Sequence, residues 1–514
     1  MIDCLFVNPN SSSENYQALA NDVAAIEPPV WSLLLAESCR SKGYSVEILD
    51  CDAERLTDET AIRRIIFLAP KLVCFVTYGQ NPNASTTNTV GTIRLANKLK
   101  SVINTFITIS IGSHTSALPL EVLSEPGIDF VAINEGVYTL HDLLQVTNFY
   151  DKTQLEKVRG LGWKNYGYDL KCKDFLVLNN NAQIVPQSRL DIDLPGMAWD
   201  LLPYKNSFLD LYRCHVWHNN YDPHTRSPFA SLYTSLGCVK KCSFCMINIV
   251  NRTNTADNVD ASFSPIMRYF STDWVKKQLE YLTSRGVKNI RFADELFFLN
   301  RKHYEPILDS IIDKQQSINW WAYSRIDTIK DQFLLKFQKA GCNYLALGIE
   351  AASQKIRQEI DKGRFEEIDI RDIVKKIKNS GINAGNNFIF GFPNEKLENL
   401  QETLDLSIEL EGDFNNYYAA VALPGSPLYF EAKKNGWELP STLDGYGFLA
   451  YNHLPLRTHH LSAAEVLKFR DEAWHKYFES ESFLNRTEQK FGLVSRQYIE
   501  EITKIKLKRK ILGD

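Results

Sequence analysis

The feature that most constrains the fold is a regular alternation of apolar and amphipathic segments, which runs through two blocks of the 514-residue chain. In the first block, residues 1–145, apolar runs such as "DCLFVN", "LVCFVTY" and "FITISIG" alternate with helical stretches such as "VWSLLLAESCRSKG". Continuous apolar strands that alternate with helices indicate a parallel, doubly wound α/β sheet. Ligands bind to such sheets beyond the carboxyl ends of the strands. Here those ends carry polar segments such as "NPNSSSEN", "YGQNPNAST" and "GSHTSALP".

The same alternation resumes in the second block, residues 226–430. Six apolar runs, from "FASLYTSLG" to "NNYYAAVAL", are each followed by a helical stretch. This pattern predicts a barrel or partial barrel with its active site at the carboxyl ends of the strands. Between the blocks, residues 146–225 are rich in proline, aromatic and turn residues, and we interpret them as a connecting segment. Residues 431–514 have the pattern of a polar-rich helical region.

Bulk composition excludes several classes of protein. A net charge of −4 does not mark the whole chain as a binder of nucleic acid or of a membrane surface. The N-terminus has no basic segment followed by a long apolar run, so no secretion signal is predicted. The best candidate for a membrane span is interrupted by Pro70 and Lys71. Seven of the ten cysteines are scattered singly, which favours a reducing cytoplasm. Together with the charge and the apolar runs, this predicts a cytoplasmic protein with no nucleic-acid partner and no membrane span.

The other three cysteines, Cys238, Cys242 and Cys245, follow the first apolar run of the second block at spacings of four and three. Four-iron clusters are held by thiolates, normally four, and three protein ligands leave one iron open, as in catalytic metal sites. A zinc site would need a histidine as fourth ligand, and the candidates are His215, His218 and His224. No second Cys or His pair follows at zinc-site spacing, and a Cys242–Cys245 redox pair leaves Cys238 unexplained. The pattern therefore favours an iron–sulfur cluster.

This Cys-x-x-x-Cys-x-Phe-Cys motif resembles the signature of the radical S-adenosylmethionine (SAM) enzymes. The resemblance implies that Cys238, Cys242 and Cys245 are metal ligands and catalytic residues, because they hold a [4Fe-4S] cluster whose open iron binds SAM. One electron would then cleave SAM to methionine and a 5′-deoxyadenosyl radical, which takes a hydrogen atom from the substrate. Phe244 matches the aromatic position whose backbone lies near the adenine of SAM.

The resemblance also implies SAM contacts at successive strand ends. Glu295 in "FADE", with Asp294 as the alternative, would hold the ammonium group, although "FA" departs from the Gly-Gly that is frequent there. Arg325 in "YSRID" would pair with the SAM carboxylate. Glu350 in "LGIEAAS" would lie near the ribose or the amino group. Gly391 in "FIFGFPNE" would let the backbone approach the adenine.

The order of the two blocks resembles the cobalamin-binding subclass of these enzymes over nearly the whole chain. This resemblance implies an α/β protein with an N-terminal Rossmann-like cobalamin-binding domain, a radical SAM partial (β/α)6 TIM barrel and a C-terminal helical region. The implied cobalamin contacts are Tyr78, Gln80, Asn81, Gly112, Ser113, His114, Glu135 and Gly136. The chain lacks the Asp-x-His-x-x-Gly motif of proteins that supply a histidine to cobalt. A sheet domain that serves as a scaffold without cobalamin is therefore the alternative.

The leading hypothesis is a cobalamin-dependent radical SAM methyltransferase. It would transfer a methyl group from methylcobalamin to an unactivated carbon of a small-molecule or natural-product substrate, through the 5′-deoxyadenosyl radical. One alternative is a radical SAM cyclase or rearrangement enzyme that binds cobalamin but transfers no methyl group. A hypothesis of a different class is a non-catalytic scaffold that binds zinc. The resemblance further implies an electron donor such as flavodoxin or ferredoxin.

Overall fold

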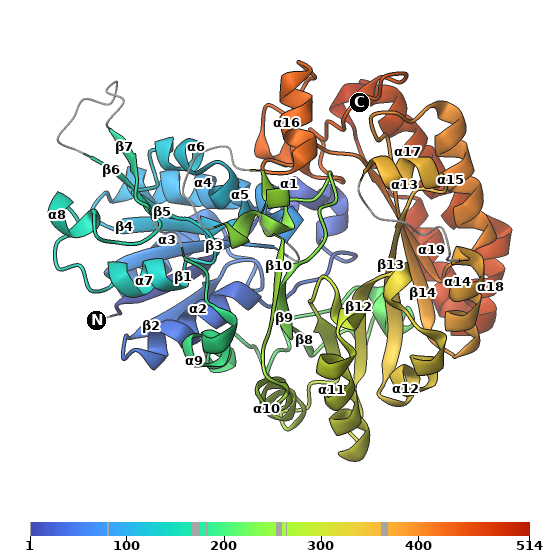
Figure 1. Ribbon diagram of the computed structural model, residues 1–514, viewed down its shortest axis with the longest axis horizontal. Helices are drawn as coiled ribbons and strands as arrows, with labels where there is room; N and C mark the ends of the chain where they lie inside the picture. The colour runs from blue at the N-terminus through green and yellow to red at the C-terminus, as the bar shows by residue number, and fades with distance from the viewer. Residues whose placement is uncertain are drawn as a thin grey trace.

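The computed structural model describes residues 2–79, 82–165, 175–180, 183–252, 260–263, 265–360 and 369–514. Two sheets lie side by side, with a β-hairpin between them and a group of C-terminal helices beyond the second sheet (Figure 1). Among the described helices, none combines the length and the apolar run that crossing a bilayer requires.

The first sheet has, in the described part of the chain, seven strands in the order β2-β1-β3-β4-β5-β6-β7. Neighbouring strands from β1 to β5 are parallel, and β6 and β7 are antiparallel. Alternate residues of a strand face opposite sides: Phe6 joins the core on one face and Leu5 the core on the other. Burial on both faces explains the continuous apolar runs. The strands are β1 Cys4–Asn8, β2 Val46–Asp50, β3 Leu72–Thr77, β4 Ile107–Gly112, β5 Phe130–Ala132, β6 Leu161–Lys164 and β7 Leu176–Leu178.

Helices cover both faces of this sheet, as the doubly wound prediction requires. Helices α2 and α7 contribute to one core, and α3, α4 and α6 to the other (Figure 1). The helices are α1 Ser12–Tyr16, α2 Val30–Ser41, α3 Asp58–Leu68, α4 Ser85–Val102, α5 Ser113–Ala117, α6 Pro119–Ser124, α7 Val137–Leu143 and α8 Lys152–Leu155. The sheet extends past the predicted boundary at residue 145, because β6 pairs with β5.

The rest of the connecting segment, which includes α9 (Leu190–Asp193), packs between the two sheets. Its Trp199 indole N–H donates to Gln278 Oε1 of helix α10 (Thr272–Thr283) over 2.9 Å. Farther along, the carbonyl oxygen of His218 accepts from the side-chain amides of Asn319 and Asn343, each over 3.1 Å. These asparagines lie at or near the starts of two barrel strands, so the segment runs across the amino ends of the barrel strands.

The second sheet is the predicted partial barrel, and its described strands are all parallel in the order β15-β14-β13-β12-β11-β8. The apolar run "FASLYTSLG" forms two strands and not one, because the chain leaves the barrel sheet near Thr234. Its N–H and hydroxyl donate to Asp294 over 3.0 and 2.8 Å. After this turn, β9 forms an antiparallel hairpin with β10. The strands are β8 Phe229–Leu232, β9 Ser235–Cys238, β10 Ile266–Tyr269, β11 Asn289–Phe292, β12 Asn319–Arg325, β13 Cys342–Glu350, β14 Asn383–Phe390 and β15 Phe414–Ala419.

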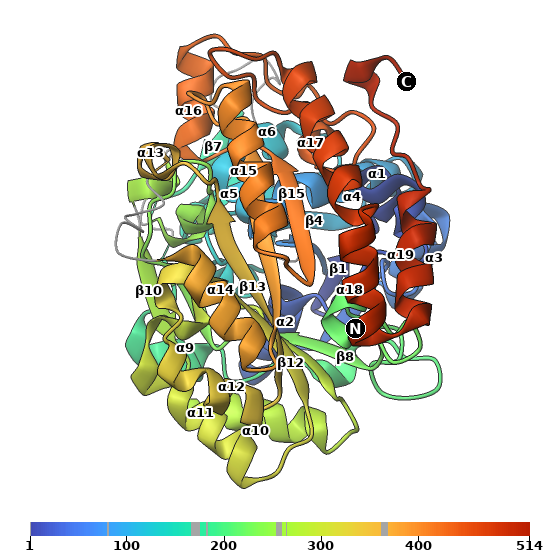
Figure 2. The ribbon, with the colours of Figure 1, turned by 90° about the vertical axis from the view of Figure 1, so that its right-hand side faces the viewer.

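The C-terminal helices cover the open edge of the barrel sheet, where α17 lies beside β15 (Figure 2). Arg470 Nε of α17 donates to the carbonyl oxygen of Tyr417 over 2.6 Å, and the Tyr477 hydroxyl to that of Gly412 over 2.7 Å. These bonds satisfy edge carbonyls that would otherwise be unpaired. The helices of this half are α10 Thr272–Thr283, α11 Arg301–Asp313, α12 Leu334–Lys339, α13 Gln354–Glu359, α14 Ile370–Asn379, α15 Leu397–Glu409, α16 Pro427–Lys434, α17 Ala463–Phe478, α18 Glu481–Phe491 and α19 Leu493–Thr503.

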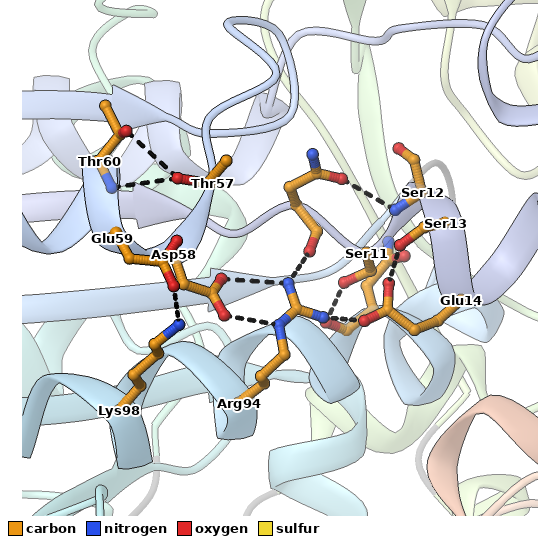
Figure 3. Close-up of polar contacts among 12 residues, drawn as sticks. Ser11, Ser12, Ser13, Glu14, Thr57, Asp58, Glu59, Thr60, Arg94 and Lys98 are labelled. Atoms are coloured by element: carbon orange, nitrogen blue, oxygen red, sulfur yellow. Dashed lines mark hydrogen bonds and ion pairs between the residues drawn. The ribbon is translucent and has the colours of Figure 1, made fainter. Parts of the chain in front are cut away.

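A polar network fixes the short helix α1 against the rest of the first domain (Figure 3). Arg94 of α4 pairs with Asp58 of α3 (Nε to Oδ2, 3.0 Å) and with Glu14 of α1. The same guanidinium donates to the carbonyl oxygen of Asn10 over 2.7 Å. Because α1 contributes to the wall of the main cavity, this network helps to set the shape of the site.

Candidate active site

A cavity of about 960 Å³ lies between the first domain, the barrel strands and the C-terminal helices. Its wall on the first domain includes Asn15 of α1 and Thr87 of α4. On the barrel it includes the three cysteines and side chains from the ends of successive strands. A cavity of this size, placed at the carboxyl ends of barrel strands, is the expected position of an active site in such folds.

The three-cysteine loop begins at Cys238, the last residue of β9, and all three thiols line the cavity. The side chain of Asn248 shapes the loop: its Oδ1 accepts from the Cys238 N–H over 3.3 Å, and its Nδ2 donates to the Lys240 carbonyl over 3.0 Å. Burial raises the pKa of the Cys245 thiol, and the neighbouring Cys242 raises it further. A thiolate here therefore requires a compensating cation, which a metal cluster supplies.

The described residues contain no group of three or more His, Cys, Asp or Glu side chains arranged to hold one metal ion. A cubane cluster does not need such a group, because each of its thiolates binds a different iron. The described residues therefore give the zinc alternative no support.

The acidic pair after β11 divides into one structural and one available side chain. Asp294 is fully buried and accepts from the Thr234 N–H, the Thr234 hydroxyl and the Ser235 hydroxyl. Glu295 lines the cavity, and its Oε1 has no hydrogen-bond partner although it is buried. Burial raises the pKa of Glu295 to about 8, with a smaller contribution from Asp294. A cationic ligand beside Glu295 would stabilise the ionised carboxylate and so offset the cost of its burial.

Two more of the predicted SAM contacts line the same cavity at the ends of their strands. Arg325 ends β12 and holds Asp327 through two hydrogen bonds, Nε to Oδ1 over 2.9 Å and Nη2 to Oδ2 over 2.8 Å. Glu350 ends β13 with a φ of +70°, next to a shift of register between β13 and β14. Left-handed backbone at a non-glycine residue is uncommon and occurs at functional sites. Here it accompanies a carboxylate on the cavity wall.

The remaining two predicted SAM contacts differ in position. Phe244 lines the cavity and packs on Phe392, with ring centroids 5.6 Å apart. Gly391, with a φ of +92°, lies where a Cβ would collide with Val466 of α17. The described cavity wall does not include Gly391. The glycine turn therefore lets α17 approach β14, and Glu395 Oε2 holds it by accepting from the Gly391 N–H over 2.7 Å.

The structure places the described candidates for cobalamin contact behind the cavity wall. The Tyr78 hydroxyl donates to the Asn134 carbonyl over 2.7 Å. Gly112 leaves room for Thr77, because a Cβ would lie 2.6 Å from the Thr77 carbonyl oxygen. Ser113, His114, Glu135 and Gly136 are also buried, and Gln80 and Asn81 lie outside the described residues. Burial lowers the pKa of His114 to about 4, so this imidazole is neutral.

Several wall residues were not among the sequence-predicted contacts. Asn83, in the polar segment "YGQNPNAST", contacts Cys245 of the three-cysteine loop, called the cluster loop below. Asn15 has a buried Oδ1 without a hydrogen-bond partner. In the connecting segment, Trp217 stacks between His215 and Phe414, with centroid distances of 4.3 and 3.9 Å. The C-terminal tail also reaches the wall, through residues 505–507, 512 and 514. The polar segment was a usable signal for Asn83, whereas the other positions depend on contacts between distant parts of the chain.

Comparison with known proteins agrees with this architecture. The model of the radical SAM superfamily matches residues 232–407, and that of the B12 binding domain matches residues 16–144. An uncharacterized methyltransferase of Pyrococcus horikoshii is 26% identical over 469 residues, which are 90% of this chain and 90% of that protein. An anaerobic magnesium-protoporphyrin IX monomethyl ester cyclase of Rubrivivax gelatinosus is 24% identical and covers 93% and 78% of the two chains.

Among solved structures, the cobalamin-dependent SAM radical enzyme OxsB with aqua-cobalamin and SAM bound has the same fold. Its TM-score is 0.66 at 15% sequence identity, over 98% of this chain and 71% of that one. The chain thus combines a B12-binding domain with a radical SAM domain, which is the domain combination of cobalamin-binding radical SAM enzymes. Its cofactors are accordingly a [4Fe-4S] cluster, SAM and cobalamin.

The residues of the cavity fit these cofactors chemically. Three thiols on one loop match a cluster with an open iron. The unpaired, buried carboxylate oxygen of Glu295 suits the ammonium group of SAM. The wall of the first domain carries the small or polar residues Asn83, Thr87 and Asn88. Such a wall suits a flat macrocycle with amide side chains, which can hydrogen-bond to it.

Proposed function

We propose that the chain is a cobalamin-dependent radical SAM methyltransferase that acts on a small-molecule substrate. The observation that carries this proposal is the shared cavity, in which the three cysteines of the barrel and the α4 segment of the B12-binding domain form parts of one wall. Cofactors in the two domains could therefore act on one substrate. The Pyrococcus methyltransferase, which is similar over 90% of both chains, supports methyl transfer as the reaction.

In this proposal each group on the wall has a defined task. When bound, the reduced cluster supplies the electron that cleaves SAM to a carbon radical, and cobalamin carries the methyl group. Cys238, Cys242 and Cys245 bind the cluster, and Glu295 holds the SAM ammonium. Arg325 lies where it can pair with the SAM carboxylate, and its two bonds to Asp327 fix the direction of its guanidinium.

The barrel interior provides the substrate side of the cavity. Tyr323 of β12, Asn387 of β14 and Tyr418 of β15 line it, together with Trp217 from the connecting segment. Aromatic and apolar walls exclude water, which protects a reactive radical from side reactions. The Asn387 and Asn416 amides are already joined (Asn416 Nδ2 to Asn387 Oδ1, 2.8 Å), so they form a fixed polar strip beside the aromatic wall. An organic molecule with both apolar and polar parts fits this lining.

A product analysis tests the proposal against the cyclase alternative, which is considered because the Rubrivivax relative is named a cyclase. The full-length protein is purified without oxygen, loaded with cluster and cobalamin, and incubated with reductant, SAM and a cell extract as substrate source. Methyl transfer to carbon consumes two SAM molecules and predicts S-adenosylhomocysteine and 5′-deoxyadenosine in equal amounts. A cyclase forms 5′-deoxyadenosine without stoichiometric S-adenosylhomocysteine. The Cys238→Ala variant is the control and should form no 5′-deoxyadenosine.

We further propose that the reductant is a flavodoxin or ferredoxin and that the enzyme works in the cytoplasm.

A further inference from the structure

The side-chain amide of Asn83 connects the first domain directly to a cysteine of the cluster loop. Its Nδ2 lies 3.5 Å from Cys245 Sγ, and the two residues are 162 positions apart in the chain. Its Oδ1 accepts from the backbone N–H of Met246 over 3.0 Å. The same Oδ1 lies 3.6 Å from Cys245 Sγ. A thiolate only accepts hydrogen bonds, so when Cys245 is a thiolate the NH₂ group is the part of the amide that can bond to the sulfur.

The first domain fixes the position of this amide. Asn83 lies in the short turn Pro82–Ala84 that leads into α4. The next residue but one, Ser85, donates its hydroxyl to the Thr77 carbonyl at the end of β3 and accepts from the His114 N–H over 3.1 Å. Thr86 also reaches the cluster loop, with its hydroxyl 3.9 Å from Met246 Sδ. The end of β3 and α5 thus hold the start of α4 against the loop.

From this geometry we infer that Asn83 is a positioning residue, which donates a hydrogen bond to the Cys245 thiolate and raises the reduction potential of the cluster. The inference rests on the proposed function, because it requires the cluster. Reduction adds negative charge to the cluster and its sulfurs. A donor to a ligating sulfur stabilises that charge, so it makes the cluster easier to reduce. The B12-binding domain therefore contributes to the chemistry of the cluster as well as to cobalamin binding.

Two substitutions separate the hydrogen bond from the packing of the side chain. Asn83→Asp keeps the shape of the side chain and an acceptor for Met246, but it replaces the donor with a negative charge. Asn83→Ala removes the whole amide. The matched control is Asn88→Ala, which removes another amide of the same cavity wall, one that is bonded to Asn15 (Nδ2 of Asn15 to Oδ1 of Asn88, 3.0 Å).

The measurement is a redox titration of the cluster followed by EPR, on the full-length, reconstituted protein without substrate. We expect a lower midpoint potential in Asn83→Ala, a still lower one in Asn83→Asp, and the wild-type value in Asn88→Ala. Wild-type potentials in both Asn83 variants, with full iron and sulfide content, would overturn the inference. An equal shift in Asn88→Ala would also overturn it, because the effect would then belong to the wall in general.

The same preparation distinguishes failure of this inference from failure of the proposed function. Iron and sulfide analysis of the wild-type protein reports whether the cluster exists, independently of its potential. If the Asn83 variants alone lose the cluster while their circular dichroism spectra match the wild type, the contact at Cys245 is required for cluster binding, which supports the positioning role. Loss of the cluster from the Asn88→Ala variant as well would count against it.

Discussion

Arg268 on β10 and Glu135 after β5 form an ion pair whose side chains are only 2% and 1% exposed. The pair joins the hairpin that carries Cys238 to the segment that follows the carboxyl end of β5 in the first sheet. Both carboxylate oxygens are in use, since Oε2 also accepts from the Val185 N–H over 3.0 Å and from Arg268 Nη1 over 3.1 Å. Glu135 thus links the two domains behind the cluster loop, which is a structural role and not one of contact with the cavity.

Removal of one partner should be costly, because it leaves the other charge buried and unpaired. We expect Glu135→Ala to lower the free energy of unfolding by about 3–5 kcal/mol, measured by urea unfolding of the full chain. The double variant Glu135→Leu/Arg268→Met removes both charges and should be more stable than either single change. A Glu135→Ala protein as stable as the wild type would contradict this account of the domain junction.

The cluster ligands predict a selective loss of iron. Cys245→Ala should bind little iron and form no 5′-deoxyadenosine, because a cluster held by two thiolates on one loop is not retained. The control is Cys342→Ala, since Cys342 is buried at the start of β13, outside the cavity wall. This variant should keep its iron and its activity towards SAM. Equal iron content in the two variants would rule out the assignment of the loop.

The adjacent acids after β11 should respond differently to replacement by the corresponding amide. Asp294→Asn weakens bonds to Thr234 and Ser235, so it should lower the melting temperature. Glu295→Gln replaces a carboxyl group whose buried Oε1 has no hydrogen-bond partner, so it should leave the melting temperature unchanged or raise it. Its effect should appear in SAM binding, as an increase in Kd of roughly tenfold, or about 1.4 kcal/mol. Calorimetry of each variant with and without SAM checks both expectations.

The sequence was sufficient to predict the two-domain fold. Strand β3 is signalled by the continuous apolar run "LVCFVT", and turn residues mark its ends. The cysteine spacing likewise predicted one loop at the barrel opening, where the structure places Cys238, Cys242 and Cys245. Such features depend on residues close together in the chain, which is why pattern and spacing can predict them.

Features that depend on distant segments were not predictable in this way. Asp294 and Glu295 differ in availability because Thr234, which lies 60 residues earlier, hydrogen-bonds to the Asp294 carboxylate. The Gly391 turn has the sequence of an adenine contact, yet Val466 of α17 packs against it. Strand β6 extends the first sheet by pairing with β5, and the segment that contains β6 shows only weak alternation of apolar and polar residues. Periodicity within a segment carries no information about such partners.

The pH dependence of SAM binding should follow the ionisation of Glu295. Burial raises its pKa from the ordinary value of 4.5 to about 8, so the carboxyl is protonated in the free enzyme at neutral pH. Its contribution to folding stability is accordingly complete below pH 4.5 and is lost as the pH rises through about 8. In the proposed site a bound ammonium group would stabilise the carboxylate, so SAM binding should expel the proton.

SAM affinity should therefore rise with pH between 6 and 8, by up to about tenfold per unit, and this rise should end above pH 8. In Glu295→Gln no proton is released at this position, so the rise should disappear. Any titration of SAM itself stays in both proteins and cancels in the comparison. Calorimetric titration of SAM into the cluster-loaded proteins, at several pH values and in buffers of different ionisation enthalpy, measures both affinity and proton release. The same pH slope in wild type and Glu295→Gln would show that another group meets the ammonium.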